Sequence, residues 1–191
     1  MENFTKKLII FFILPLFLLF LAFGIAFFQS RQDFKLHVSF YDNFTFIKTF
    51  QNHKVIIDGG PNDQILTTLG SKLAFYDHDI DLLVLTKVDT KHVSGLVDVL
   101  KRYNVKAVLI PESSANLAAF WQFLDLVDKK HVKKMFMKDG ERLWLDQSNV
   151  FDIYKSDPFF AQLSFGQTKI VIPDVQNHGE AVSDGANLVR N

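Results

Sequence analysis

The pattern of apolar and polar positions divides the chain into one uninterrupted apolar run and a longer region in which apolar positions recur periodically. From Leu8 to Phe28 no side chain is charged or able to form a hydrogen bond. At a rise of ~1.5 Å per residue, a helix over this run spans the ~30 Å hydrocarbon core of a bilayer. The pattern therefore predicts a transmembrane helix over residues 8–28, preceded by a short tail over residues 1–7.

The clearest periodic stretch begins at Ile80. Ile80–Leu85 is a short apolar run rich in β-forming residues, which is typical of a strand buried on both faces. The polar tract Thr86–His92 then predicts a loop at the carboxyl end of that strand. Apolar residues recur at helical spacing over Val93–Tyr103, and Lys106–Ile110 predicts the next strand. Together these segments predict a βαβ unit.

The segments around this unit predict further strands and helices. Leu36–Phe40 alternates as a strand does, and Lys54–Asp58 reads as a second buried strand that ends in a Gly-Gly-Pro turn. We expect Asp63 to cap one helix, and Ser113 or Ser114 to cap another.

The length of the chain allows one compact domain after the apolar run. We expect this domain over residues 35–175. Residues 176–191 are mostly small and polar, so the sequence predicts a flexible tail there.

Several segments in register carry a resemblance to a known family. They are Val55–Asn62, Ile80–Thr86, His92–Leu96 and Lys169–Asp174. These segments resemble the metallo-β-lactamase superfamily, and most closely the extracytoplasmic hydrolase-like domain of the ComEC competence proteins of bacteria, which take up transforming DNA. The resemblance implies an α/β fold, a metallo-β-lactamase-like αββα sandwich. We expect it to be truncated at the C-terminus, because the family's Gly-His-His-Gly-Ser block is not matched.

The tract after the central strand departs from the family's metal-binding motif. In the family this loop reads Thr-His-x-His-x-Asp-His. The resemblance aligns the first His with Lys87, the second with Asp89 and the Asp with Lys91, so that only His92 keeps the family residue. Downstream, Asp174 matches the Asp that bridges two metals in the family.

These exchanges argue against hydrolysis. A two-metal hydrolase needs several imidazoles and carboxylates around its cations. Lysine at neutral pH is a cation that only donates hydrogen bonds, so Lys87 and Lys91 repel a metal. We therefore expect no cofactor. The alternative is a residual zinc or manganese site held by His92, Asp174 and Asp89.

The exchanged lysines suggest a further hypothesis. Without metals, Asp174 and the pocket residue Asp58 are left as unpaired acids, and Lys87 or Lys91 can supply compensating charge. The alternative is that the lysines are solvated and that His92 caps the following helix. His178 is a weaker candidate for a replacement metal ligand.

The charge of the chain gives no support to DNA binding. Its 21 Lys and Arg residues balance its 21 Asp and Glu residues, which is not the composition of a general nucleic-acid binder. A basic cluster over Lys129–Lys134 reads as a solvated helix end, where cations also favour the helix dipole.

The apolar run has a second interpretation as a cleaved signal peptide, with Lys6 and Lys7 before it and Gly24-Ile25-Ala26 as the cleavage site. We favour an uncleaved single-pass anchor, because the apolar residues continue through Phe28. The flanking charges give little asymmetry for orientation. We expect a cell-membrane protein with an extracytoplasmic domain, as the family resemblance implies.

Three hypotheses of function follow. The first is a catalytically inactive, membrane-anchored binding or scaffold module, with a competence or envelope protein as partner and a possible link to DNA uptake. The second is a residual metal-dependent hydrolase or nuclease acting on phosphodiesters. The third is a degenerate fragment that binds neither metal nor partner.

Overall fold

The computed structural model describes residues 15–23, 35–154, 160–172 and 179–190. The chain divides into two compact units, residues 1–34 and residues 35–191. In the first unit residues 15–23 are helical. No helix within the described ranges has the length and apolar character needed to cross a membrane. Most of the predicted membrane segment, residues 8–28, lies outside the described residues.

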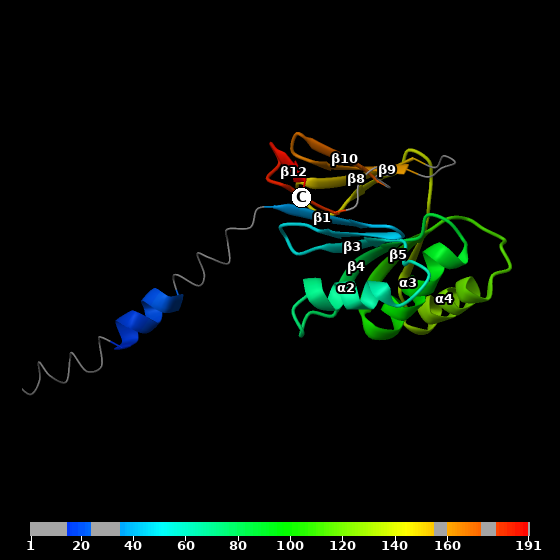
Figure 1. Cartoon of the computed structure of the whole chain (residues 1–191), viewed down its shortest axis with the longest axis horizontal. Helices are drawn as coiled ribbons and strands as arrows, with labels where there is room; N and C mark the ends of the chain where they lie inside the picture. Colours follow the sequence, from blue (N-terminus) through cyan, green and yellow to red (C-terminus); the bar gives the residue numbers. More distant parts are fainter. Residues whose placement is uncertain (1–14, 24–34, 155–159, 173–178, 191) are drawn as a thin grey trace, which may run out of the picture. The chain divides into compact units, whose positions relative to one another are not determined.

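The second unit is built on an eight-stranded sheet (Figure 1). The strand order across it is β12-β11-β1-β2-β3-β4-β5-β6. The strands are β1 (Leu36–Tyr41), β2 (Phe44–Lys48), β3 (Lys54–Ile57), β4 (Asp79–Val84), β5 (Asn104–Ile110), β6 (Lys133–Phe136), β11 (Gly179–Ser183) and β12 (Leu188–Arg190).

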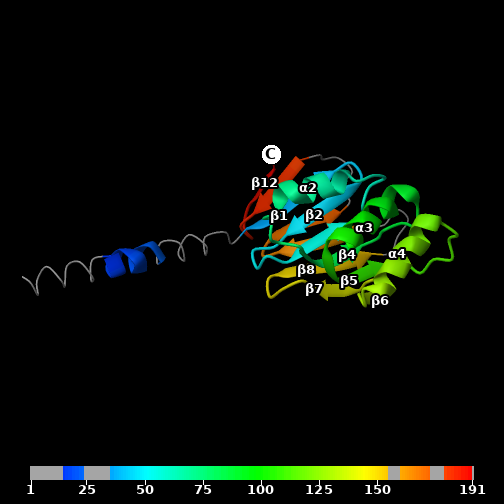
Figure 2. The same ribbon diagram turned by 90° about the horizontal axis from the view of Figure 1, so that it is seen from below.

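Strands β3 to β6 are parallel to one another. Helices α2 (Gln64–Lys72), α3 (Thr90–Arg102) and α4 (Ala118–Lys129) connect them in order, and all three helices cover the same face of the sheet (Figure 2). The predicted βαβ unit is confirmed as β4-α3-β5. The predicted serine cap is wrong: α4 begins at Ala118, and its N-cap residue is Leu117. Asp63 does occupy the N-cap position of α2, but its side chain forms no capping hydrogen bond.

A second sheet packs against the other face of the first. Its strand order is β10-β9-β8-β7. The strands are β7 (Arg142–Trp144), β8 (Asn149–Tyr154), β9 (Phe160–Phe165) and β10 (Thr168–Ile172).

The central strands β3 and β4 of the large sheet are buried on both faces, as the apolar runs predicted. Ile56 of β3 and Leu83 of β4 belong to the core under the helices. Their neighbours Val55 and Val84 belong to the core between the two sheets, where they meet Leu163 of β9. Alternate side chains of a strand point to opposite faces, so one strand contributes to both cores.

The described layers are helices, large sheet and small sheet. The αββα sandwich is thus only partly observed, because no described helix covers the outer face of the small sheet. The reason is the path of the chain: the strand that follows β10 in the described residues is β11, which joins the large sheet.

The predicted flexible tail is wrong for residues 179–190. Strand β11 pairs antiparallel with β1, with Leu36 opposite Ser183, and β12 pairs with β11. Ser183 is buried and its hydroxyl hydrogen-bonds that of Thr168 at 2.7 Å. Small side chains are sufficient here, because the backbone hydrogen bonds of a strand do not depend on side-chain type. The domain therefore extends beyond the expected boundary at residue 175.

Candidate functional site

The candidate site lies where β3 and β4 end. Asp58 follows β3 and Thr86 follows β4, and these two strands are parallel neighbours. The carboxyl ends of adjacent parallel strands lie at one edge of a sheet, which is where open α/β sheets place their ligands. The structure therefore brings Asp58 and the tract Thr86–His92 together, as the sequence predicted.

The loop after β4 is shorter than the predicted loop Thr86–His92. Helix α3 begins at Thr90 rather than after His92, so Lys91 and His92 lie in its first turn. Asp89 is the N-cap residue, and its carboxylate accepts a hydrogen bond from the backbone N–H of His92 at 3.1 Å. An Asp in this position satisfies one of the free N–H groups at a helix start.

The carboxylate of Asp58 is almost fully buried and is held by Thr86. It accepts hydrogen bonds from the Thr86 backbone N–H at 2.8 Å and from the Thr86 hydroxyl at 2.7 Å. Burial raises the pKa of Asp58 to about 6, against the opposing effect of these hydrogen bonds and of the nearby His92. Its backbone φ of 60° lies in the left-handed region, where Asp is one of the better-tolerated residues.

Asp89 is bound by both of its neighbours in the motif. The His92 Nδ1 atom hydrogen-bonds Asp89 Oδ1, and the Lys87 Nζ atom lies 3.9 Å from Asp89 Oδ2. Partial burial acts to raise the pKa of Asp89. The hydrogen bonds and charge of His92, and to a smaller extent the charge of Lys87, outweigh it and lower the pKa. The three side chains therefore interact with one another at the start of α3.

Within the described residues neither Lys87 nor Lys91 pairs with Asp58. The oxygens of Asp58 are bound by Thr86, and Lys87 pairs with Asp89 instead. Lys91 is exposed, and within the described ranges it forms no ion pair. Asp58 lies beside the end of the neighbouring strand β4, where the backbone N–H and hydroxyl of Thr86 donate to its carboxylate. A charged side chain is therefore not needed to pair it. Asp174, the other acid of the charge-compensation hypothesis, lies outside the described residues.

The described residues do not form a metal centre. No three His, Cys, Asp or Glu side chains in the described part of the chain are grouped as metal ligands. The oxygens of Asp58 face Thr86, and Asp89 caps α3. The predicted ligands His92 and Asp89 are in contact with each other, whereas Asp174 and His178 lie outside the described residues. The described residues therefore contain only part of the predicted ligand set.

Gly59 and Gly95 fix the geometry of the site. The apolar pattern of the sequence does not identify this contact. The Gly59 N–H donates to the His92 carbonyl at 2.8 Å, and the Gly95 N–H donates to the Gly60 carbonyl at 3.0 Å. A Cβ atom built on Gly95 would lie 1.8 Å from the Gly59 carbonyl oxygen. The loop after β3 thus packs directly on the backbone of α3. The signal in the sequence was the spacing of these glycines after two consecutive buried strands.

A pocket of about 330 Å³ opens beside the site. It is lined by the β1–β2 turn, residues 60–62, Gln64 and the start of β11. Tyr41 and Phe44 stack across the turn with ring centroids 4.5 Å apart. The tract Thr86–His92 is not part of the lining. Residues 42 and 43 form the tight turn between β1 and β2.

Two of the four lysines in the basic cluster at the end of α4 pair with acids of that helix. Lys129 pairs with Asp125 at 2.8 Å, and Lys134 pairs with Asp128 at 2.6 Å. The cluster therefore presents less free positive charge than its sequence suggests.

No family model and no curated protein sequence matches the chain. Among solved structures, the fold is similar to Zn²⁺-bound PqqB from Methylobacterium extorquens, with a TM-score of 0.51 and 13% identity; the match covers 67% of this chain and 47% of PqqB. The chain has the metallo-β-lactamase fold. It spans about half the length of PqqB, and at this identity the likeness concerns the fold alone.

Two further similarities have lower TM-scores. The metallo-β-lactamase fold protein YhfI from Bacillus subtilis gives 0.43 with 14% identity, over 82% of this chain and 60% of YhfI. CmlA, a diiron β-hydroxylase from Streptomyces venezuelae, gives 0.48 with 15% identity, over 72% of this chain and 28% of CmlA.

The capping role of Asp89 leads to a stability prediction. We expect Asp89→Ala to lower the free energy of unfolding by about 1 kcal/mol, since the cap on α3 is lost, and Asp89→Asn to lower it by less, since Asn also caps helices. Urea unfolding followed by circular dichroism measures both. Asp98→Ala on the same helix removes an exposed ion pair with Lys101 and serves as the control; equal losses for Asp98→Ala and Asp89→Ala would contradict the capping role.

Proposed function

We propose that this protein is a catalytically inactive metallo-β-lactamase-fold module that acts by binding rather than by hydrolysis. The observation that supports this most directly is the use of the motif side chains within the fold. Asp89 caps α3 and binds His92 and Lys87, while Asp58 is bound by Thr86. Side chains that hydrogen-bond and pair with one another in this way are not arranged around an open metal-coordination site.

The chemistry of the motif points in the same direction. A two-metal hydrolase stabilises the attacking and leaving oxygens between two cations. An ammonium group at Lys87 adds positive charge at the place where the first metal ligand stands in the family motif. The pocket beside the site, with its aromatic pair and carboxamide side chains, gives such a module a place to bind a ligand.

We also propose that the module is related to the hydrolase-like domain of the ComEC competence proteins and acts at the cell envelope. In this proposal residues 8–28 form a single-pass anchor, the domain is extracytoplasmic, and its partner is a competence or envelope protein. The support is the sequence: the uncharged run and the motifs in register. DNA is a less favoured partner, because the net charge of the chain is zero.

A residual hydrolase acting on phosphodiesters is the second candidate, and one observation favours it. Asp89 contacts the Nδ1 atom of His92, and a carboxylate on one ring nitrogen is the arrangement that orients a histidine whose other nitrogen binds a metal. In this candidate Asp174 joins His92, and zinc or manganese is the cofactor. Asp89 then acts as an orienting partner or as an oxygen ligand.

Metal analysis separates the two candidates. For the inactive module we expect purified full-length protein to contain substoichiometric zinc and manganese by mass spectrometry, and to show no hydrolysis of bis(p-nitrophenyl) phosphate after either metal is added. Stoichiometric metal that is lost in His92→Ala but kept in the control His131→Ala, together with loss of activity, would establish the hydrolase and overturn the proposal.

A further inference from the structure

Two aromatic side chains form the most exposed apolar tip of the described domain. Phe75 is 91% exposed and Tyr76 is 76% exposed, and their rings pack edge to face with centroids 5.2 Å apart. They lie in the loop between α2 and β4. We propose that this Phe75–Tyr76 tip is a lipid-docking site that inserts into the interfacial layer of the bilayer to which the chain is anchored. The inference rests on the membrane anchor in the proposed function.

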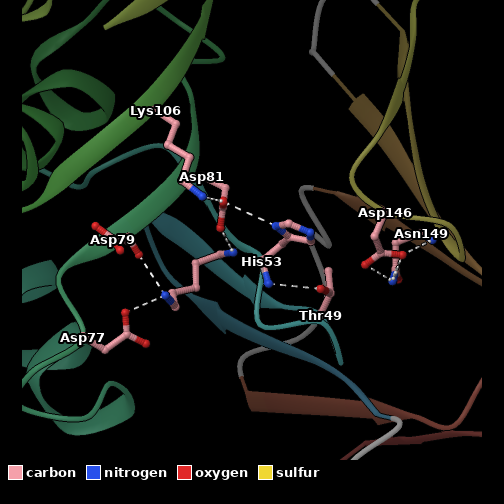
Figure 3. Close-up of polar contacts among 9 residues, drawn as sticks. Thr49, His53, Asp77, Asp79, Asp81, Lys106, Asp146 and Asn149 are labelled. Atoms are coloured by element: carbon pink, nitrogen blue, oxygen red, sulfur yellow. Dashed lines mark hydrogen bonds and ion pairs between the residues drawn. The ribbon is translucent and has the colours of Figure 1, made fainter.

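The loop that carries the tip is held firmly at its base. Lys54 is only 3% exposed, and its Nζ atom donates to Asp77 Oδ1 at 2.6 Å and to the Asp79 carbonyl at 3.0 Å. The Asp77 N–H donates to the Ala74 carbonyl at 2.8 Å, which closes the turn under the two rings. Figure 3 shows Asp77 and Asp79 beside the neighbouring contacts of Asp81 with His53 and Lys106. The exposure of the rings therefore belongs to a fixed turn.

The tip lies at the end of the domain where the chain enters it. Lys54, which binds the loop through Asp77, begins β3 and stands opposite Lys48, and Lys48 stands opposite His37 at the start of β1. Two strand spacings of ~4.8 Å therefore separate the entry of the chain from the start of β3. Figure 1 shows the start of β1 and the α2–β4 loop at the same end of the sheets.

The apolar run is connected to this end of the domain by a short segment. Residues 29–35 join Phe28 to the start of β1, and seven residues span at most about 25 Å. This length limits how far the start of β1 can lie from a bilayer that holds the proposed anchor.

The chemistry of the tip favours lipid over an oppositely charged partner. Phe and Tyr combine a large apolar ring with, in Tyr, a polar group that stays hydrated, and aromatic residues are enriched at membrane interfaces. The charges under the tip are mutually paired: Lys54 with Asp77, and Lys106 with Asp81. We therefore expect docking onto a zwitterionic bilayer, with little dependence on anionic lipid or salt.

Site-specific fluorescence in proteoliposomes tests the inference. The chain contains no cysteine, so Ala74→Cys gives a single label next to the intact tip. Ser114→Cys is the matched control, since Ser114 is exposed in the loop between β5 and α4, at the opposite end of the strands. Full-length protein carrying an environment-sensitive dye is reconstituted in phosphatidylcholine vesicles that contain a spin-labelled lipid.

The expected result is blue-shifted emission and quenching by the spin-labelled lipid at position 74, neither of them at position 114, and loss of both when Phe75→Ser and Tyr76→Ser are added. Two results together would overturn the docking site and leave the anchor in place. They are resistance of the protein to extraction by alkaline carbonate, and quenching of the label at position 74 by aqueous iodide as strongly as the label at position 114. Release by carbonate overturns the anchor, and the docking site with it. A blue shift without lipid quenching indicates a protein contact and also overturns the inference.

Discussion

Gly95→Ala is expected to destabilise the domain by about 3 kcal/mol or more, because the new methyl group meets backbone that cannot move away without breaking hydrogen bonds. The Cβ atom would lie 1.8 Å from the Gly59 carbonyl oxygen. To accommodate it, α3 must separate from the loop after β3, which breaks the hydrogen bonds from Gly59 to His92 and from Gly95 to Gly60. Urea unfolding monitored by circular dichroism measures the loss.

Gly70→Ala is the matched control, because it makes the same chemical change in a helix. No atom lies within 4 Å of a Cβ built on Gly70, so we expect a gain of about 0.5–1 kcal/mol from helix propensity. Gly59→Ala should resemble Gly95→Ala, since its Cβ would lie 2.2 Å from the Leu96 backbone nitrogen. If Gly95→Ala is as stable as the parent protein, the close approach of the loop and α3 is wrong.

Asp58→Asn is expected to remove a fall in stability that the parent protein shows between about pH 4 and pH 6. The pKa of Asp58 is raised from 3.8 to about 6 by burial. In this interval the unfolded chain has released the proton and the folded chain still holds it, so stability decreases as pH rises and becomes level above pH 6. The shift corresponds to roughly 2–3 kcal/mol of free energy of unfolding.

Asp89 provides a comparison of opposite sign. Its pKa is lowered in the fold, so its contribution to stability is present above the unfolded value and is lost as pH falls below it. Unfolding free energies of the parent protein, Asp58→Asn and Asp89→Asn, measured from pH 3 to 7, separate the two effects. His92 interacts with both acids, so differences between variants at each pH are the quantity to compare. A parent curve that rises from pH 4 to 6 as steeply as that of Asp58→Asn would show that Asp58 is already ionised there.

Much of the central fold could be predicted from the sequence, because its signals are local. The run Ile80–Leu85 and the helical spacing over Val93–Tyr103 identified β4 and α3 within one or three residues of their observed bounds. The sequence placed Asp58 near the tract Thr86–His92 only through the family resemblance; in the structure both come directly after neighbouring parallel strands.

The contacts within the site could not be predicted in the same way. Asp58 and Thr86 are 28 positions apart in the chain, and a lysine in the tract was a reasonable partner until the structure showed that the nearer donor is a backbone N–H. The role of Asp89 as the N-cap of α3 depended on where the helix begins, and helix boundaries are only weakly encoded in the apolar pattern.

The sequence by itself determined the order β3, α2, β4, α3 and β5 in the centre of the fold and the burial of β3 and β4 on both faces, because each is a property of residue type and short-range spacing. Only the tertiary structure decided that Asp89 binds His92, that Gly59 packs on Gly95, and that residues 179–183 complete the sheet beside β1. These contacts join segments through backbone geometry and through residues distant in the chain, and periodicity in a sequence carries no information about either.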